Sequence, residues 1–420
     1  MNRSIPSLQV EFAGLTLKNP FLLASASPTL TGDMIARAFE QGWAGAVTKT
    51  LKPPSLRRNW LSREPQPMLA ALKYRGRNIG MQNIATSGGH MEMADWQAQI
   101  PALKAAYPDH VVIGSIAAAL NRDDWTWLTE GMLEAGVDAI ELDASCSHSS
   151  AQLVKGRLVG EVPELAARVT RWVKAVCPKP VIVKLPAFVP DFQAMVEACA
   201  EAGAAAVSGI NTLPCLIGVN LETFEPLLSV QGRGAYGGLS GPAIKPVALR
   251  AVSQMAKAGL LPVSGIGGVA TWEDAAEFIL LGASTVQVCT AVMWNGYGII
   301  EKLVAGLAAY LESKGVENVS QLVGRTNALI EPSIANLKAR TGIRAHIVPE
   351  RCRNCGLCVV ACRDGGFQAI AEAKGLTVVD PERCDGCGLC FVVCPFGALV
   401  WCLMEGQRVL DPSLNGFGGL

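Results

Sequence analysis

The sequence lacks an excess of charge of either sign and has few charged residues overall. Lysine plus arginine and aspartate plus glutamate number 36 each, and charged residues make up 17% of the 420 residues. Proteins that hold nucleic acid or an anionic membrane surface through a basic patch carry an excess of positive charge. We therefore expect no nucleic-acid partner and no membrane partner, and we expect small molecules or other proteins instead.

A secretory leader is also missing. The first residues, MNRSIPSLQV, are followed by no apolar run and no small-residue cleavage site. This start favours a cytoplasmic protein. The uncharged run at residues 278–300 is long enough to span a bilayer, but it contains three glycines and several polar residues. We predict that it is a buried strand with its following loop.

Histidine is scarce, with four in the chain, whereas cysteine is abundant, with fourteen. Eight of the cysteines fall between Cys352 and Cys394. In a short secreted chain this density would indicate disulfides, but this chain is long and groups its cysteines at metal-ligand spacing. The pattern indicates thiolate ligands and a reducing compartment.

An alternation of short apolar runs and helical stretches fills most of the chain. After a predicted hairpin at residues 8–18, which turns at Ala13 and Gly14, eight strands are expected, at 21–25, 44–50, 111–118, 139–146, 181–186, 205–212, 262–268 and 285–292. Segments of helical periodicity lie between them, at 34–41, 163–176, 192–202, 244–258 and 272–281. Eight such units over this length predict an α/β fold, a closed (β/α)₈ TIM barrel.

The connections after the second and sixth strands, residues 51–110 and 213–243, are the longest and are predicted to cover a pocket. Chemistry in this architecture takes place at the carboxyl ends of the strands. We predict a barrel domain at residues 1–340, a cysteine-rich domain at 341–402 and a tail at 403–420.

Two tandem motifs define the cysteine-rich domain. Residues 352–362 read CRNCGLCVVAC and residues 384–395 read CDGCGLCFVVCP, both with the C-x₂-C-x₂-C-x₃-C spacing of bacterial ferredoxins. In that arrangement the fourth cysteine of each motif ligates the other cluster. The spacing predicts an α+β bacterial-type ferredoxin domain with two [4Fe–4S] clusters, one held by Cys352, Cys355, Cys358 and Cys394 and the other by Cys384, Cys387, Cys390 and Cys362. A pair of zinc sites is the alternative, although zinc ribbons usually separate two CxxC pairs by a long loop.

Clusters of this kind carry one electron each, whereas chemistry on organic molecules usually needs two, so a flavin is the logical adaptor between them. The Gly265–Gly268 run at the end of the seventh strand and Cys289-Thr290 in the eighth lie where such barrels form a phosphate site. The glycines of residues 232–237, GRGAYG, match a dinucleotide motif but lack a clear preceding strand and a following acidic residue. Nicotinamide is therefore expected on another polypeptide.

Several segments carry a family resemblance. They are NPFLLASASP at 19–28, GWAGAVTKT at 42–50, ELDASC at 141–146, VKLP at 183–186, GINT at 209–212, YGGLSGPAIKPVALR at 236–250, SGIGG at 264–268 and QVCTAV at 287–292. Together they resemble the dihydropyrimidine dehydrogenase family, and within it the bacterial subunit type that carries FMN and two clusters. The resemblance covers nearly the whole chain and implies a dihydroorotate dehydrogenase-like barrel that reduces, or reversibly oxidises, an activated C=C bond of a pyrimidine-like ring.

The resemblance also implies partners and site residues. The partner subunit would bind FAD and NAD(P)H, the substrate would be a small cyclic unsaturated molecule, and the assembly would be a homodimer or a heterotetramer. Cys146 would be the general acid, because a thiol with an ordinary pKa near ~8.5 is still protonated near neutrality. The substrate residues would be Asn83, Asp143, Asn211 and Thr212. The FMN contacts would be Ser25, Lys49, Thr50, Lys184, Ser240, Gly241, Gly267, Gly268, Cys289 and Thr290.

The sequence departs from the family pattern around the predicted substrate. Ala85 stands at the family's glutamate, and Asp143 at an asparagine. A planar diamide offers both donors and acceptors, and each lost pocket partner costs about 1–3 kcal/mol. We therefore predict weak or absent activity on uracil and thymine. Two other functions stay open: a dihydroorotate-type oxidation, and an electron-transfer subunit with a catalytically idle barrel.

Overall fold

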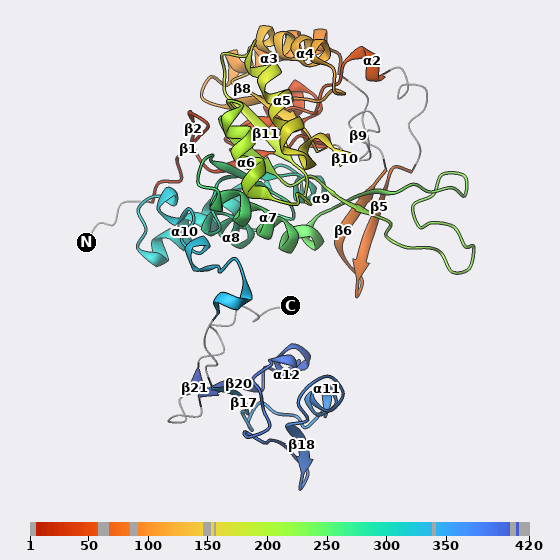
Figure 1. Ribbon diagram of the computed structural model, residues 1–420, viewed down its shortest axis with the longest axis vertical. Helices are drawn as coiled ribbons and strands as arrows, with labels where there is room; N and C mark the ends of the chain where they lie inside the picture. Colours follow the sequence, from red (N-terminus) through yellow and green to blue (C-terminus); the bar gives the residue numbers. More distant parts are fainter. Residues whose placement is uncertain are drawn as a thin grey trace. The chain divides into compact units, whose positions relative to one another are not determined.

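Within the part of the chain that the structure describes, eight parallel strands close into a barrel (Figure 1). The last strand pairs with the first, where Val286 lies opposite Phe21. In order around the barrel the strands are β3 (Phe21–Leu23), β4 (Gly45–Val47), β7 (Val111–Ile116), β8 (Ala139–Asp143), β11 (Val181–Leu185), β12 (Ala206–Gly209), β15 (Val263–Ile266) and β16 (Ala283–Val288). The predicted TIM barrel is confirmed.

The computed structural model describes residues 6–57, 67–84, 91–145, 153–154, 157–337, 342–403 and 409–410. The chain divides into two compact units, Met1–Ile330 and Glu331–Leu420. The barrel belongs to the first unit, and the predicted cysteine motifs belong to the second. No helix among the described residues is both long enough and apolar enough to cross a membrane.

Helices surround the barrel and are fixed by local signals at their ends (Figure 1). Side chains of Thr31, Asn121, Asp191 and Thr271 accept hydrogen bonds from first-turn amides, which satisfies donors that a helix start leaves unpaired. The helices of this unit are α1 (Gly32–Gln41), α2 (Pro54–Arg57), α3 (Met93–Ala106), α4 (Arg122–Ala135), α5 (Pro163–Lys174), α6 (Phe192–Glu201), α7 (Lys245–Lys257), α8 (Trp272–Leu280), α9 (Thr290–Asn295) and α10 (Ile299–Lys314).

The eighth strand ends earlier than the sequence predicts. It stops at Val288, and the amides of Val292 and Met293 donate back to the carbonyl of Cys289, which begins the short helix α9. The prediction of a strand to residue 292, followed by a loop, is therefore wrong at its end. Periodicity does not separate a buried strand from a buried helix within one uncharged, mostly apolar run.

The predicted hairpin at the start of the barrel unit forms from β1 (Val10–Phe12) and β2 (Leu15–Leu17). Its turn residues Ala13 and Gly14 both have positive φ, at 53° and 79°, as a two-residue turn of type I′ requires.

The two long connections meet in one further sheet. Its strand order is β13-β14-β6-β5, with β5 (Leu69–Tyr74) and β6 (Arg77–Asn83) from the first connection, and β13 (Leu213–Cys215) and β14 (Gly237–Ser240) from the second. The junction pairs Asn83 with Gly238 and Ser240 with Met81. Because Gly237 opens a strand rather than a helix, the GRGAYG run does not form the strand–turn–helix of a dinucleotide site.

The second unit contains paired strands and two short helices around a small core. Its core residues include Ala345, Ile370 and Leu399, together with three of the motif cysteines. The elements are β17 (Ile343–Ile347), α11 (Leu357–Gly365), β18 (Ile370–Ala373), β19 (Leu376–Val379), α12 (Leu389–Val393), β20 (Leu399–Leu403) and β21 (Val409–Leu410). This is an α+β arrangement, as predicted.

Candidate functional site

The residues predicted for the barrel site gather at the carboxyl ends of its strands. The strands are parallel, so their carboxyl ends lie at the same mouth of the barrel. Ser25 follows β3 and Thr50 follows β4, and their hydroxyl oxygens lie 2.9 Å apart. Thr50 Oγ1 also lies 3.1 Å from the hydroxyl of Ser115 on β7. Strand ends far apart in the sequence thus form one polar rim.

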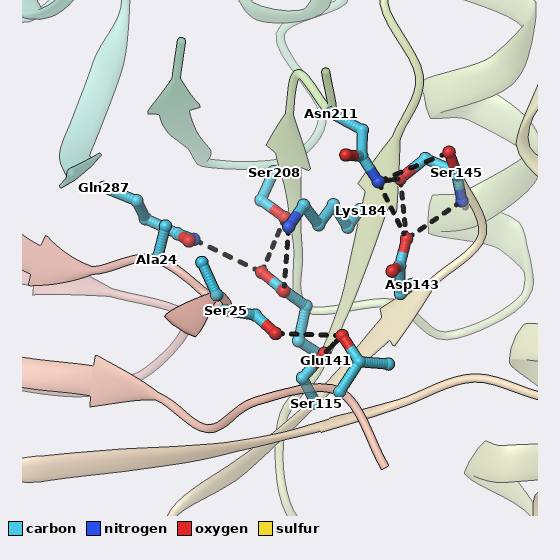
Figure 2. A network of polar contacts seen from close by, with 12 residues as sticks. Ala24, Ser25, Ser115, Glu141, Asp143, Ser145, Lys184, Ser208, Asn211 and Gln287 are labelled. Carbon is cyan, nitrogen blue, oxygen red and sulfur yellow. Dashed lines mark hydrogen bonds and ion pairs between the residues drawn. The ribbon is translucent and has the colours of Figure 1, made fainter. Parts of the chain in front are cut away.

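Two predicted substrate residues are joined by hydrogen bonds at this mouth (Figure 2). The Asp143 Oδ1 atom accepts from the backbone amide of Ser145 at 3.1 Å, from its hydroxyl at 2.7 Å and from Asn211 Nδ2 at 3.4 Å. Asn211 Nδ2 also donates to the Ser145 hydroxyl at 2.9 Å. This ring of bonds fixes the orientation of Asp143, which is 5% exposed.

The other two predicted substrate residues meet across the four-stranded sheet. A methyl group on Gly238 would lie 2.2 Å from Thr212 Oγ1 and 2.7 Å from Asn83 Oδ1, so both side chains crowd this glycine. Asn83 Oδ1 is buried and accepts no hydrogen bond. Thr212 is linked to the first pair because its backbone amide donates to Asn211 Oδ1 at 2.8 Å. The four substrate candidates therefore form one group, in which Asn83 Oδ1 is a buried acceptor without a hydrogen-bond donor among the described residues.

A backbone cradle lies next to this group. Gly241, Gly267 and Gly268 have φ values of 90°, 129° and 82°, which side-chain-bearing residues rarely adopt. A methyl group on Gly268 would lie 3.0 Å from the Gly241 carbonyl oxygen and 2.9 Å from the Lys245 amide nitrogen, so these backbones approach closely. Nearby, Thr290 Oγ1 donates to Ser240 Oγ at 2.9 Å. Glycine-lined backbone of this kind can approach a phosphate closely.

A polar network lies inside the barrel below the mouth (Figure 2). Lys184 on β11 is 5% exposed, and its Nζ atom lies 4.0 Å from Oε1 of Glu141 on β8. Glu141 has no exposed surface, and its Oε2 atom accepts from Ser208 Oγ at 2.9 Å and from Gln287 Nε2 at 3.2 Å. Burial raises the pKa of Glu141, and the charge of Lys184 acts most strongly in the opposite direction. The network joins side chains from four strands.

The thiol of Cys289 lies near both predicted lysines, Lys184 and Lys49. Burial raises the pKa of this thiol to about 11, while the positive charges of Lys184 and Lys49 act to lower it. The thiol is therefore neutral near pH 7, and both ammonium groups are close enough to influence it. The mouth of the barrel carries two lysine charges beside an uncharged sulfur.

Two of the predicted positions lie outside the described residues. Cys146, the predicted general acid, and Ala85, the predicted departure from the family pattern, are both outside the described residues. Their described neighbours are Ser145, which bonds to Asp143, and Ile84, which follows β6. The role of Cys146 stays a prediction.

In the second unit the motif cysteines line two separate cavities. One is lined by Cys352, Cys355, Cys358 and Cys394, and the other by Cys362, Cys384, Cys387 and Cys390. Each cavity thus takes three cysteines from one motif and the fourth from the other, which is the grouping that the spacing predicts. Among the described residues, no three histidine, cysteine, aspartate or glutamate side chains are arranged to hold a single metal ion.

Backbone amides point at several of these sulfur atoms. Ala369 N donates to Cys362 Sγ at 3.2 Å, Asn354 N to Cys352 Sγ at 3.4 Å, and Ala345 N to Cys384 Sγ at 3.5 Å. Hydrogen bonds to ligand sulfurs stabilise the negative charge of a cluster and tune its reduction potential. The thiol-lined cavities therefore fit iron–sulfur clusters chemically.

Sequence reasoning missed Glu141, Ser145, Ser208 and Gln287. A usable signal was present for Glu141, because it lies two residues before Asp143 on one strand and so faces the same side of the barrel wall. Ser208 and Gln287 gave no signal of their own. Only the closure of the barrel brings β12 and β16 near β8.

Comparisons with known proteins agree with this geometry. Residues 7–311 match the family model described as dihydroorotate dehydrogenase, and residues 345–400 match that of a 4Fe-4S dicluster domain, which favours iron–sulfur clusters over the zinc alternative for the second unit. The chain is 35% identical over 367 residues to the NAD-dependent dihydropyrimidine dehydrogenase subunit PreA of Escherichia coli K12, covering 86% of this chain and 87% of that protein. It is 32% identical over 336 residues to the chloroplastic NADP(+) dihydropyrimidine dehydrogenase of Arabidopsis thaliana, covering 77% of this chain and 78% of that protein. It is 35% identical over 323 residues to the catalytic subunit of dihydroorotate dehydrogenase B (NAD(+)) of Pyrococcus abyssi, covering 76% of this chain and 98% of that protein.

Proposed function

Since the chain belongs to the dihydroorotate dehydrogenase family, we propose that it is a flavin and iron–sulfur oxidoreductase that reduces, or reversibly oxidises, an activated C=C bond of a pyrimidine-like ring. The observation that carries this proposal is the convergence of Lys184, the glycine cradle and an unpaired buried acceptor, Asn83 Oδ1, at one barrel mouth. The same chain carries a dicluster domain, which would supply or remove the electrons.

FMN fits the barrel mouth. When bound, it exchanges single electrons with clusters and electron pairs, as hydride, with an organic substrate. Gly241, Gly267 and Gly268 would hold its phosphate, and Lys49 and Lys184 would place positive charge beside its ring. Ser25, Thr50, Ser240, Cys289 and Thr290 would complete the contacts.

The substrate residues have separate tasks in this proposal. Asn83 and Thr212 would bind one edge of the ring, and Asn211 with Asp143 the other. Cys146 would donate a proton to the ring carbon next to the one that receives hydride. Cys146 directly follows Ser145, whose hydroxyl donates to Asp143.

A partner subunit is part of the proposal. The E. coli relative is called NAD-dependent and a subunit. We infer a partner that binds FAD and NAD(P)H and delivers electrons to the clusters, in a homodimer of chains or a heterotetramer.

Dihydroorotate-type oxidation is the second candidate, because the P. abyssi relative is aligned over 98% of its length. That alignment spans only 76% of this chain, whereas the E. coli relative is aligned over 86%. The longer alignment favours the dihydropyrimidine type.

Gly268→Ala is expected to weaken FMN binding by at least about tenfold. The new methyl group would lie 2.8 Å from Lys245 Cβ and 2.9 Å from Lys245 N, at a φ of 82° that alanine adopts only with strain. Titration of the apoprotein with FMN measures the loss. Gly315→Ala is the matched control, because Gly315 has a φ of 63° but no heavy atom near its new methyl group. Equal FMN affinity in both variants would contradict the cradle.

Asp143→Asn is expected to increase kcat/KM for uracil by about 10- to 100-fold, since an amide restores a donor that an ionised carboxylate lacks. Anaerobic steady-state assays with uracil and other cyclic unsaturated compounds measure the change. A wild-type kcat/KM for uracil within about twofold of the best substrate would show that Asp143 does not disfavour uracil.

A further inference from the structure

We propose that Glu141 is a positioning residue that fixes the Lys184 ammonium group in place for the flavin ring. This inference rests on the proposed function, because it concerns how the same site holds FMN. It adds a residue that does not itself contact the cofactor and acts only through the lysine.

The geometry holds the Glu141 carboxylate in one orientation (Figure 2). Its Oε2 atom takes hydrogen bonds from Ser208 on β12 and Gln287 on β16. Its Oε1 atom accepts no hydrogen bond and lies 4.0 Å from Lys184 Nζ. Ser208 and Gln287 thus bind Oε2, and Oε1 is the oxygen that faces the Lys184 ammonium group.

Burial of the Glu141 carboxylate would destabilise the fold if the carboxylate had no partner. Glu141 has no exposed surface, and its neighbours include the buried core of the barrel. A carboxylate removed from water is strongly destabilised unless it is paired and hydrogen-bonded. Burial raises the pKa of Glu141, while the nearby charge of Lys184 and the hydrogen bonds from Ser208 and Gln287 act to lower it and so favour the charged form.

Other charged groups also face Lys184. Asp143 lies beside it in the strand register, but its Oδ1 atom is occupied by Ser145 and Asn211. Lys49 and the neutral thiol of Cys289 complete the surroundings. Lys49 would add repulsion, whereas the Glu141 carboxylate, 4.0 Å from Lys184 Nζ, would help to keep Lys184 protonated.

Glu141→Gln tests this directly, because the amide keeps the shape and loses the charge. A buried ammonium that loses a neighbouring carboxylate releases its proton more readily, so we expect Lys184 in this variant to become neutral at a lower pH than in the wild-type protein. We expect the ratio of variant to wild-type FMN dissociation constants to be about ten near pH 8.5 and about two near pH 6.5. Titration of each apoprotein with FMN, followed by flavin fluorescence, measures both ratios.

Glu130→Gln is the matched control, because it removes a carboxylate from the exposed face of α4. It should give a ratio near one at both pH values. A pH-independent ratio for Glu141→Gln would overturn the inference, since loss of packing alone does not depend on the charge of Lys184. If wild-type apoprotein binds no FMN, the proposed function itself fails, which is a different result.

Two further variants keep the test decisive. In a Lys184→Met background, Glu141→Gln should cause no additional pH-dependent loss, because its effect passes through the lysine. If Glu141→Gln does not fold, Ser208→Ala removes only a donor to Oε2. We expect from it a smaller loss of FMN affinity that still grows with pH, and a loss that does not grow with pH would overturn the inference.

Discussion

Cys146→Ala is expected to lower substrate turnover by about 10²- to 10⁴-fold, the usual contribution of a positioned general acid, and to leave reduction of the flavin by the clusters unchanged. Hydride transfer to one carbon of an activated double bond leaves the neighbouring carbon in need of a proton. Alanine cannot supply it. Anaerobic stopped-flow measurement separates the two steps, because flavin absorbance reports reduction and its recovery reports turnover.

Cys177→Ala is the matched control for this substitution. Cys177 is buried in the segment between α5 and the amino end of β11, and its thiol donates to the carbonyl of Lys179. Its loss should reduce stability slightly and leave turnover intact. Unchanged turnover in Cys146→Ala would show that another group donates the proton.

Cys394→Ala is expected to remove the cluster that the first motif, residues 352–362, is predicted to hold. Electron entry from a nicotinamide-linked partner should then be abolished. Cys394 belongs to the second motif in the sequence but lines a cavity with Cys352, Cys355 and Cys358. Loss of one of four ligands destabilises a [4Fe–4S] cluster, so iron content should fall by about half. Iron analysis and the cluster absorption of the purified variant measure this.

Cys402→Ala is the matched control, since Cys402 lies on β20 outside both motifs. It should keep its full iron content. If Cys394→Ala retains both clusters, the grouping of three cysteines from one motif with a fourth from the other is wrong.

The barrel architecture could be predicted from the sequence, because strands and helix starts are specified by neighbouring residues. Each barrel strand is a short apolar run, and each helix start has its own cap, such as Thr31 or Thr271. The end of the eighth strand was not predictable, because the run around Cys289 is uncharged and mostly apolar, and its helical turn depends on backbone hydrogen bonds back to that residue. Local patterns place elements well and their ends less well.

The site was less predictable because its parts come from distant segments. The pairing of Gly238 with Asn83 joins positions far apart in the chain, and it requires both long connections to fold onto the barrel mouth. The neighbourhood of Glu141 likewise depends on closure of the barrel. The family resemblance suggested Asn83 and Asp143 but not the network below them.

The pocket also bears on the rival functions. An idle barrel would have no use for a buried lysine–glutamate pair or for an unpaired acceptor at Asn83, both of which cost stability. Asp143 sits in a prepared hydrogen-bonded setting, which favours a substrate ring with a donor at that edge. Active chemistry on a bound ring would account for the buried pair and for the unpaired acceptor.

The most direct test of the central claim is anaerobic reduction of the purified protein followed by addition of pyrimidines and other cyclic unsaturated compounds. We expect the protein to contain FMN and two [4Fe–4S] clusters, and at least one compound to restore the absorbance of oxidised flavin within seconds. A reduced flavin that none of the compounds reoxidises, in a protein with intact clusters, would contradict it and favour an electron-transfer subunit.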